Sequence, residues 1–255
     1  MPTPTVINQW RWSDAISRNF WDGNYQYENW KQAPISSCKT GGATSATLTN
    51  VLYSPYIQLE FEPLSTQVAP TLAPQIVTVS EGISGLDIGM TQTDDVGVEL
   101  CPGILNANHM AFKIGEANAF FFRVKFSIED VSGTDDCAIG FRKVEAYQAN
   151  IDDYADMAVL NVISGNINIE TILAGAATVT TDTTDNWANT ETHQLEVFVS
   201  STGVVTYTID NVAPTVTAPY TFTDNLYVVP FFYFLNSTDL AGAVVIQEWE
   251  CGYQS

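Results

Sequence analysis

The residues of this 255-residue chain with most capacity for chemistry are grouped carboxylates. Asp152, Asp153 and Asp156 lie within five positions of one another and could offer oxygen ligands to Ca²⁺. An acidic loop of this kind is more often only solvated. We therefore predict no metal, and keep these three aspartates as a calcium candidate.

A second acidic pair flanks a tryptophan near the end of the chain. Glu248 and Glu250 lie two positions apart, so on a strand they share one face. Retaining glycosidases use two carboxylates about 5 Å apart, and a tryptophan beside acids can stack on a sugar. The alternative is a solvated acidic face above a buried Trp249. We favour this alternative and do not expect hydrolysis from the pair.

Other catalytic signatures are missing from the sequence. His109 and His193 are the only histidines, and neither has neighbours that indicate a nucleophile–base pair. Walker A, HExxH and EF-hand motifs do not occur, nor does GxGxxG after a strand. The four cysteines lie far apart without a CxxC pair, which favours buried thiols over a zinc site and leaves a single disulfide between two of them as an alternative. We predict that the protein is not an enzyme and needs no cofactor.

The charge of the chain limits its partners. It carries 29 acidic and nine basic residues, a formal net charge of −20. The net charge is +1 over residues 1–50, −7 over residues 51–143 and −14 over residues 144–255, which contain no Lys or Arg. Such a field repels nucleic acids and anionic membranes, and the apolar runs are far shorter than the roughly 20 residues of a membrane span. We expect no nucleic-acid or membrane partner.

Residues 1–68 are predicted to form an aromatic-rich N-terminal arm and linker. Four of the six tryptophans lie in the first 50 residues, which show no sustained strand or helix period. A Gly/Ser/Thr-rich stretch follows at residues 36–50. Two interpretations stay open: the arm docks on a partner, or it packs back on its own β-domain. The candidate partner-binding residues are Trp10, Trp12, Phe20, Trp21, Tyr25, Tyr27 and Trp30.

Residues 69–255 have the pattern of a β-sandwich. Short runs of Val, Ile, Phe, Thr and Tyr are broken by Gly, Pro, Asn or Asp every eight to twelve residues. We predict strands at Ile76–Val79, Val96–Leu100, Ala111–Ile114, Phe120–Ile128, Ala138–Val144, Met157–Ile163, Ile167–Leu173, His193–Ser200, Val204–Asp210, Leu226–Leu235 and Ala243–Cys251. The expected core residues are Phe122, Val124, Phe126, Leu195, Val197, Tyr207 and Ile209. The one expected helical turn lies near Trp12–Phe20.

Part of this region carries a family resemblance. The run from Trp187 to Val197, followed by Gly203 to Asp210, resembles the W…H-x-L-x-V…G-x-x-x-Y-x-I-D pattern of concanavalin A-like and laminin G-like jelly rolls. That family usually continues Asp-Gly, whereas this chain has Asp210-Asn211, and Asn also tolerates a positive φ. The resemblance covers residues 70–255. It implies an all-β, concanavalin A-like jelly-roll sandwich of two antiparallel sheets, preceded by the irregular arm.

Residues 140–162 and 230–254 are similar in style to virion structural proteins of marine bacteriophages. This resemblance implies a non-enzymatic capsid decoration or cement protein on the capsid exterior, assembled in the host cytoplasm. Its partners would be the major capsid protein or other virion proteins, and further copies of the chain. The alternative is a carbohydrate-binding or tail receptor-binding module that uses Trp187 or Trp249 as a sugar platform. A glycosidase of the same fold with an unrecognised acid pair is a further alternative.

Overall fold

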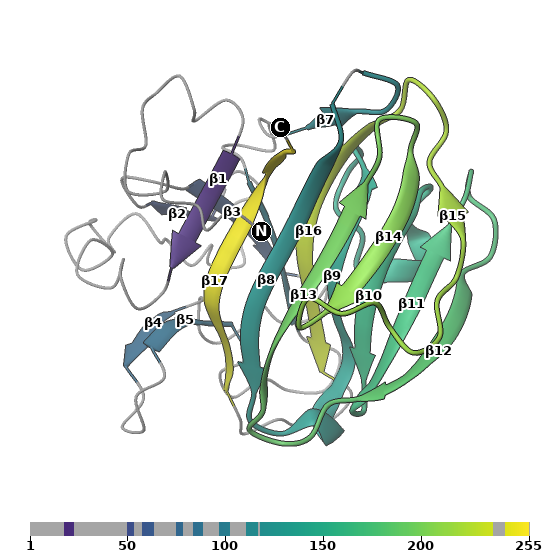
Figure 1. Ribbon diagram of the computed structural model, residues 1–255. Coiled ribbons are helices and arrows are strands. Elements are labelled where there is room, and N and C mark those ends of the chain that lie inside the picture. The colour runs from purple at the N-terminus through teal and green to yellow at the C-terminus, as the bar shows by residue number, and fades with distance from the viewer. Residues whose placement is uncertain are drawn as a thin grey trace.

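The computed structural model describes residues 18–22, 50–53, 58–63, 75–78, 84–88, 97–102, 111–116, 118–236 and 243–254. This part of the chain is almost entirely β-structure, with two 3₁₀ turns at Val131–Gly133 and Ile151–Asp153. Two antiparallel sheets pack face to face (Figure 1). No helix among these residues is long and apolar enough to cross a membrane. The prediction of an all-β sandwich is confirmed.

We call the first sheet the front sheet, because it faces the viewer in Figure 1. Its order is β15-β14-β13-β8-β17-β5-β4, and β1 also pairs with β17. Its strands are β1 (Arg18–Asp22), β4 (Gln75–Thr78), β5 (Ser84–Asp87), β8 (Phe120–Ile128), β13 (Thr192–Val199), β14 (Val204–Ile209), β15 (Tyr220–Thr221) and β17 (Val244–Tyr253).

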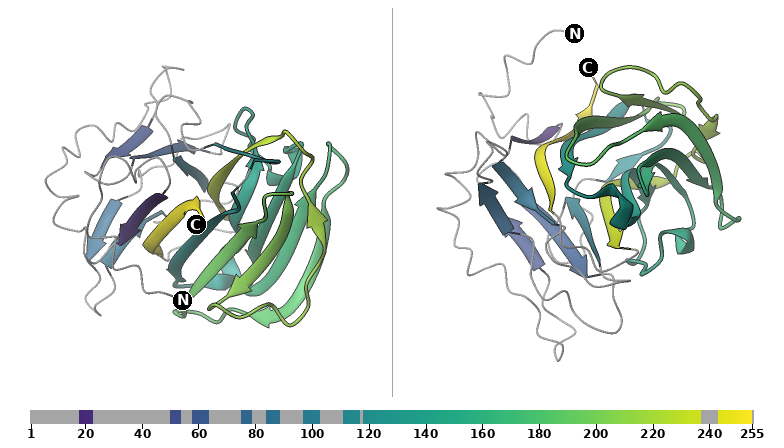
Figure 2. Two further views of the ribbon diagram at one scale, coloured as in Figure 1. Left: turned by 45° about the horizontal axis from the view of Figure 1, so that its top comes forward. Right: turned by 90° about the horizontal axis from the view of Figure 1, so that it is seen from below.

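The second sheet, the back sheet, has the order β12-β11-β10-β9-β16-β6-β3-β2, and β7 pairs with β16. Figure 2 shows it as a separate layer behind the front sheet. Its strands are β2 (Asn50–Tyr53), β3 (Gln58–Pro63), β6 (Gly97–Pro102), β7 (Phe112–Lys113), β9 (Thr134–Lys143), β10 (Met157–Ile163), β11 (Asn166–Ile172), β12 (Val179–Asn186) and β16 (Tyr227–Asn236).

The core lies between the two sheets and follows the alternation of the strands. Six of the seven expected core residues are buried there, and Ile209 is partly buried against them. Aromatic rings from the two sheets meet edge to face, such as Phe126 of β8 and Phe232 of β16 at 5.0 Å between ring centres. Because successive side chains point to opposite faces, this packing also decides which residues each strand turns outward.

The predicted strands agree well with the observed ones in the second half of the chain. β8 and β10 have the expected bounds, and the remaining predicted strands are present with ends shifted by a few residues. Strand β12 was not predicted. Its sequence, VTTDTTDN, is polar at every position after the first, so it lacks the alternation of apolar and polar residues that indicates a strand. The helical turn expected near Trp12–Phe20 is wrong for residues 18–20, which lie in β1; residues 12–17 lie outside the described part.

Three strands come from the segment expected to be an arm and linker. β1 pairs with β17, while β2 and β3 extend the back sheet beyond β6. At these residues the chain packs on its own β-domain through backbone pairing. The division into residues 1–68 and 69–255 stays a prediction.

The turn after β14 has the conformation that the sequence pattern suggests. Asp210 and Asn211 have φ of 52° and 66°, and they separate Ile209 from Val212, which form an isolated bridge. Two consecutive left-handed residues are the signature of a type I′ hairpin turn. Asn211 therefore occupies the position where the family usually has glycine.

We predict opposite effects for two substitutions at this turn. Asn211→Gly should raise the free energy of unfolding by up to about 1 kcal/mol, because glycine adopts a positive φ without strain. Asn211→Ala should lower it by a similar amount. Both variants lose the Gln194–Asn211 side-chain hydrogen bond, so comparing their urea denaturation curves isolates the backbone effect. Equal stabilities would contradict the left-handed turn.

Candidate functional site

The outer face of the back sheet brings together polar side chains from three neighbouring strands. Asp136 of β9, Asn161 of β10 and Glu170 of β11 lie on the face turned away from the front sheet. The Asn161 amide nitrogen donates to an Asp136 oxygen at 2.6 Å and to a Glu170 oxygen at 2.7 Å. Its carbonyl oxygen accepts the Cys137 N–H at 2.9 Å. The amide of Asn161 is therefore held in one orientation, with both N–H groups on carboxylates.

This bridge sets the spacing of the two acids. One oxygen of Asp136 and one oxygen of Glu170 accept hydrogen bonds from the same Asn161 nitrogen, so these two oxygens lie within about 5 Å of each other. The two carboxyl groups of a retaining glycosidase have a similar separation. The other oxygen of Glu170 accepts the Thr180 hydroxyl of β12 at 3.0 Å. The side chains of Asp136 and Glu170 are 9% and 5% exposed, so the pair lies just beneath the surface.

Burial changes the acidity of both groups. It raises the pKa of Asp136 to about 7, and the Glu170 carboxylate adds to this rise while the Asn161 hydrogen bond opposes it. Burial also raises the pKa of Glu170, again against the hydrogen bond from Asn161. Desolvation disfavours two adjacent negative charges. The pair therefore still binds protons at pH values where exposed carboxylates have lost them.

The same face carries a buried ion pair that fastens the loop after β9. The Arg142 guanidinium donates to Glu99 of β6 at 2.8 Å, and the Tyr154 hydroxyl donates to the other Glu99 oxygen. The guanidinium also lies over the Tyr154 ring, 4.7 Å from its centre, and donates to the carbonyl oxygen of Glu145. These bonds satisfy two charges in the interior and hold residues 144–156 against the outer face of the back sheet.

The calcium candidates lie on this loop but do not converge. Asp156 is buried and accepts the Ala174 N–H at 3.0 Å, whereas Asp152 is exposed and accepts the Thr178 hydroxyl at 2.6 Å. Asp153 is exposed. Within the part of the chain that the structure describes, no three His, Cys, Asp or Glu side chains are grouped so that they could hold a metal ion. Asp152, Asp153 and Asp156 are therefore not brought together as a calcium site.

The alternative of a sugar platform at Trp187 or Trp249 is not supported, because both side chains are buried. Trp187 and Trp249 are 2% and 0% exposed. The Trp249 ring lies 4.5 Å from Phe122 and the Trp187 ring 4.5 Å from Phe126, both within the core. Each tryptophan occupies an inward position, so neither can present a ring face to a ligand.

Glu248 and Glu250 form ion pairs with basic side chains of the neighbouring strand β8. Glu248 lies opposite Lys125 of β8 with 3.4 Å between nitrogen and oxygen, and Glu250 forms an ion pair with Arg123. Arg123 also lies 3.7 Å from Glu196 of β13. The burial of Trp249 is as expected, but its flanking acids are in an ion-pair ladder across the outer face of the front sheet.

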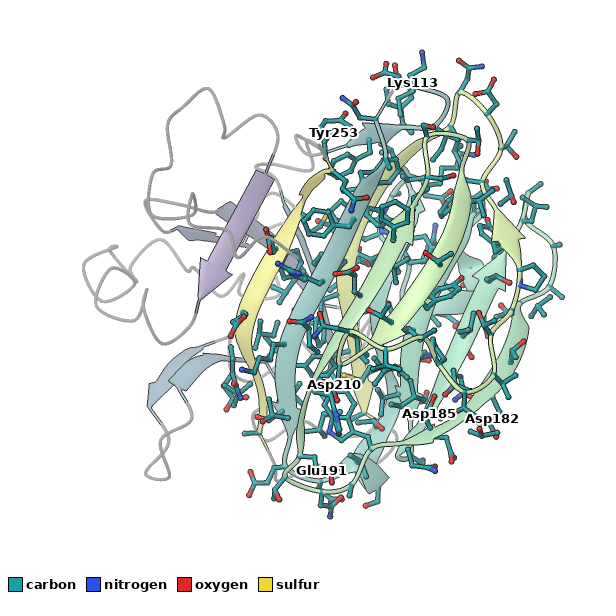
Figure 3. The ribbon with its side chains drawn as sticks, in the orientation of Figure 1. Lys113, Asp182, Asp185, Glu191, Asp210 and Tyr253 are labelled. Atoms are coloured by element: carbon teal, nitrogen blue, oxygen red, sulfur yellow. The ribbon has the colours of Figure 1, made fainter. Side chains whose placement is uncertain are left out.

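His193 links the loop before β13 to the turn after β14 at one end of the sandwich. Its Nδ1 lies 2.7 Å from Asp210 and its Nε2 3.1 Å from Glu191, and its ring packs edge-on against Trp187. Figure 3 shows Glu191 and Asp210 at the same end of the front sheet. Burial alone would lower the pKa of His193, but its two carboxylate partners raise it. His193 therefore links two loops through carboxylate partners, and neither of these partners is a hydroxyl or thiol group that it could activate as a nucleophile.

Two of the proposed arm residues fall within the structure. Phe20 and Trp21 lie in β1, opposite Glu250 and Trp249 of β17. Trp10, Trp12, Tyr25, Tyr27 and Trp30 lie outside the described residues. Their role in binding a partner stays a prediction.

Sequence reasoning missed the Asp136–Asn161–Glu170 group. The two acids are 34 positions apart, on strands that are not hydrogen-bonded to each other, so no local spacing indicates their proximity. The only available signal was strand alternation, which places each of them beside an apolar residue that faces the core.

Comparison with known proteins supports the fold. No family model matches the sequence, and no curated protein matches it. One similar structure is described as that of endo-acting O-glycanases of the human gut microbiota: it has 12% identity and a TM-score of 0.51, with 83% of this chain and 97% of that chain covered. The Emp47p carbohydrate recognition domain has 13% identity and a TM-score of 0.47 (75% and 93% covered). The Bacillus licheniformis β-glucanase has 7% identity and a TM-score of 0.46 (76% and 92%).

At such identities these similarities concern the fold alone. They do not confirm the prediction that the chain is not an enzyme, and they give no support to a bacteriophage origin. The chain has the concanavalin A-like jelly-roll fold.

We predict that the buried acid pair makes the protein more stable in mild acid. Asp136 in the unfolded chain ionises near pH 4 but in the folded chain near pH 7. The folded state therefore binds more protons between these values, and stability falls as pH rises through this window, by an amount on the order of 2–4 kcal/mol. Urea denaturation at pH 4.5 and pH 7.5 measures this difference.

The Asp136→Asn variant should lose most of this dependence, since its amide cannot ionise. Asp182→Asn removes an exposed charge from β12 and should keep the dependence, which controls for the general repulsion of an acidic protein. Identical pH slopes in the two variants would contradict the assignment to Asp136.

Proposed function

We propose that this chain binds neutral carbohydrate on the outer face of strands β10, β11 and β12. The observation that carries the proposal is the polar surface on that face, where the hydrogen-bonding groups have set orientations. Glu170 lies opposite Thr180, and Asn168 opposite Asp182, next to Asn161. We call Asn161, Asn168, Glu170, Thr180 and Asp182 the polar strip.

The chemistry of the polar strip suits sugar hydroxyls. A hydroxyl both donates and accepts, and amide and carboxylate groups supply the two complementary roles. Thr180 and Asp182 are exposed, while Asn168, Glu170 and Asn161 are progressively deeper. A ligand would therefore approach over β12. Pre-positioned polar groups of this kind give specificity because only hydroxyls that match their fixed orientations can form hydrogen bonds with them.

The charge of the strip favours neutral sugars. Glu170 and Asp182 lie in the strip, and residues 144–255 contain no Lys or Arg. Arg142, on neighbouring β9, is buried and paired with Glu99. Uronates, sulfated sugars and sialic acids need a cation to offset their charge, so they are disfavoured here.

A hydrolytic activity of the same face is a second candidate, favoured by the spacing of Asp136 and Glu170. A carboxyl group that keeps its proton near pH 7 can act as a general acid, and an ionised partner within about 5 Å can act as nucleophile. The low exposure of both acids weighs against it. Binding without turnover therefore remains the primary proposal.

We also keep the virion role as a proposal about where the protein acts. It is supported by the resemblance of residues 140–162 and 230–254 to virion structural proteins and by the charge distribution. The acids of the strongly acidic segment 144–255 include exposed Asp152, Asp153 and Asp182, which would keep neighbouring particles apart. Binding to the major capsid protein or other virion proteins would place it on the capsid exterior after assembly in the host cytoplasm. Co-sedimentation with purified capsids tests this proposal.

Binding to an array of neutral and anionic glycans tests the primary proposal. We expect the intact protein to retain neutral glycans. Thr180→Ala and Asn168→Ala should each weaken binding about tenfold, the effect of losing a hydrogen bond worth 1–1.5 kcal/mol. Thr206→Ala, at an exposed threonine of β14 in the front sheet, is the matched control and should bind normally. Binding confined to anionic glycans, or unchanged by the strip variants, would refute the proposal.

Release of reducing sugar from the glycans that bind separates the two candidates. A binding protein releases none. If sugar is released and both Asp136→Asn and Glu170→Gln abolish release while Glu248→Gln does not, the acid pair is catalytic and the protein is a glycosidase.

A further inference from the structure

The acid pair beside the polar strip can gain or lose a proton without rearranging. The Asn161 amide donates one hydrogen bond to Oδ1 of Asp136 and one to Oε2 of Glu170, and the Cys137 N–H holds its carbonyl oxygen. An amide nitrogen donates and does not accept. A proton taken up by either acid therefore does not lie along these two bonds, and the bridge persists in both protonation states.

Glu170 already has a donor on each of its oxygens. Asn161 donates to Oε2 at 2.7 Å, and the Thr180 hydroxyl donates to Oε1 at 3.0 Å. A sugar on the strip therefore adds few hydrogen bonds to this carboxylate. It removes remaining water from Glu170, which is 5% exposed, and from Asp136, which is 9% exposed. Loss of water disfavours the charged form of a carboxyl group, so a covering sugar makes the doubly ionised pair less favourable.

The charges near the pair do not offset this cost. Those that act on both acids are Asp135 of β9 and Asp152 of the loop before β10, and each is acidic. On the next strand, β12, the strip contains the exposed Asp182. Strands β10, β11 and β12, which lie side by side in Figure 1, contain no Lys or Arg. A neutral sugar brings no cation of its own.

The other titratable groups around the pair are occupied or neutral. Arg142 lies six positions beyond Asp136 on β9 and pairs with Glu99. On β16, burial and the Asp136 charge raise the pKa of Tyr233, so its hydroxyl stays neutral. Burial likewise raises the pKa of the Cys137 thiol. A proton is thus the available means of reducing the negative charge of the pair.

We propose that sugar binding on the polar strip is coupled to a proton: the Asp136–Glu170 pair holds one when the sugar is bound, and binding weakens when the pair loses it. This inference rests on the proposed binding of neutral carbohydrate. The covered pair holds its proton more tightly than the open pair, so binding takes up a proton and affinity falls as pH rises. Burial already raises the pKa of Asp136 to about 7 in the open site, which places the change at and above neutral pH.

Calorimetric titration tests the coupling. The probes are three neutral pentasaccharides, cellopentaose, mannopentaose and laminaripentaose, each titrated into the intact protein at pH 5.5, 7.0 and 8.5. We expect about tenfold weaker binding at pH 8.5 than at pH 5.5, which corresponds to a rise of one unit in the pKa of the covered pair. Repeating the titration at pH 7.0 in buffers of different ionisation enthalpy should show proton uptake.

Two variants assign the effect. Asp136→Asn keeps an oxygen that can accept from Asn161 but cannot ionise, so its affinity should be the same at the three pH values. Asp153→Asn removes an exposed charge of the loop before β10 and should keep the pH dependence. Equal pH dependence in the two variants would overturn the assignment to the pair.

Carbon-13 NMR of the side-chain carboxyl groups separates this inference from the proposed function. Without sugar, we expect one carboxyl group of the pair to titrate near pH 7, and saturating pentasaccharide should raise that midpoint by about one unit. If a pentasaccharide binds equally well at the three pH values, or if both acids are ionised by pH 6, the coupling is overturned while sugar binding stands. If the pair titrates as expected but no pentasaccharide binds at any pH, the proposed function fails, and the coupling fails with it.

Discussion

Apolar packing between the inner faces of the two sheets is the interaction on which the rest of this structure depends. Between the sheets, the ring of Phe122 packs on Phe141 and that of Phe126 on Phe232, while Phe122 also packs on Trp249 of its own sheet. The ring centres of these pairs lie 4.5 to 6.3 Å apart. Since strands alternate, each inward residue commits its neighbours to the outer face. Inward Cys137, Leu160 and Ile169 thereby place Asp136, Asn161 and Glu170 together outside. The candidate site is a consequence of the core.

The outer faces then have to accommodate carboxylates in a chain with few cations. The front sheet does so by pairing Glu248 and Glu250 with Lys125 and Arg123 across two strands. In the back sheet Glu99 pairs with Arg142, whereas Asp136 and Glu170 are bridged by the amide of Asn161. An amide offsets the desolvation of a carboxylate less than a cation does, so burial raises the pKa of Asp136 to about 7 and also raises that of Glu170. The scarcity of basic residues thus produces a titratable group near pH 7.

A fold of this kind hosts both binding proteins and enzymes, so function depends on the groups placed on it. The two tryptophans that suggested a sugar platform are structural, while the residues now proposed to meet a sugar come from strands in the more acidic half of the chain. The front sheet contributes a different property, a strand edge completed by a distant segment.

Local sequence patterns determined the strands and their inward residues. β8 and β10 were predictable to the residue because alternation or unbroken apolar character is a property of neighbouring positions, and the Asp210-Asn211 turn followed from the tolerance of these two residues for positive φ. Strand order was not predictable in this way, because it depends on contacts between distant residues. Only the tertiary structure placed β9, β10 and β11 side by side, brought Asp136 within reach of Asn161 and Glu170, and showed that Trp187 lies in the core. Pairing across strands follows from the packing of whole sheets, which local spacing does not encode.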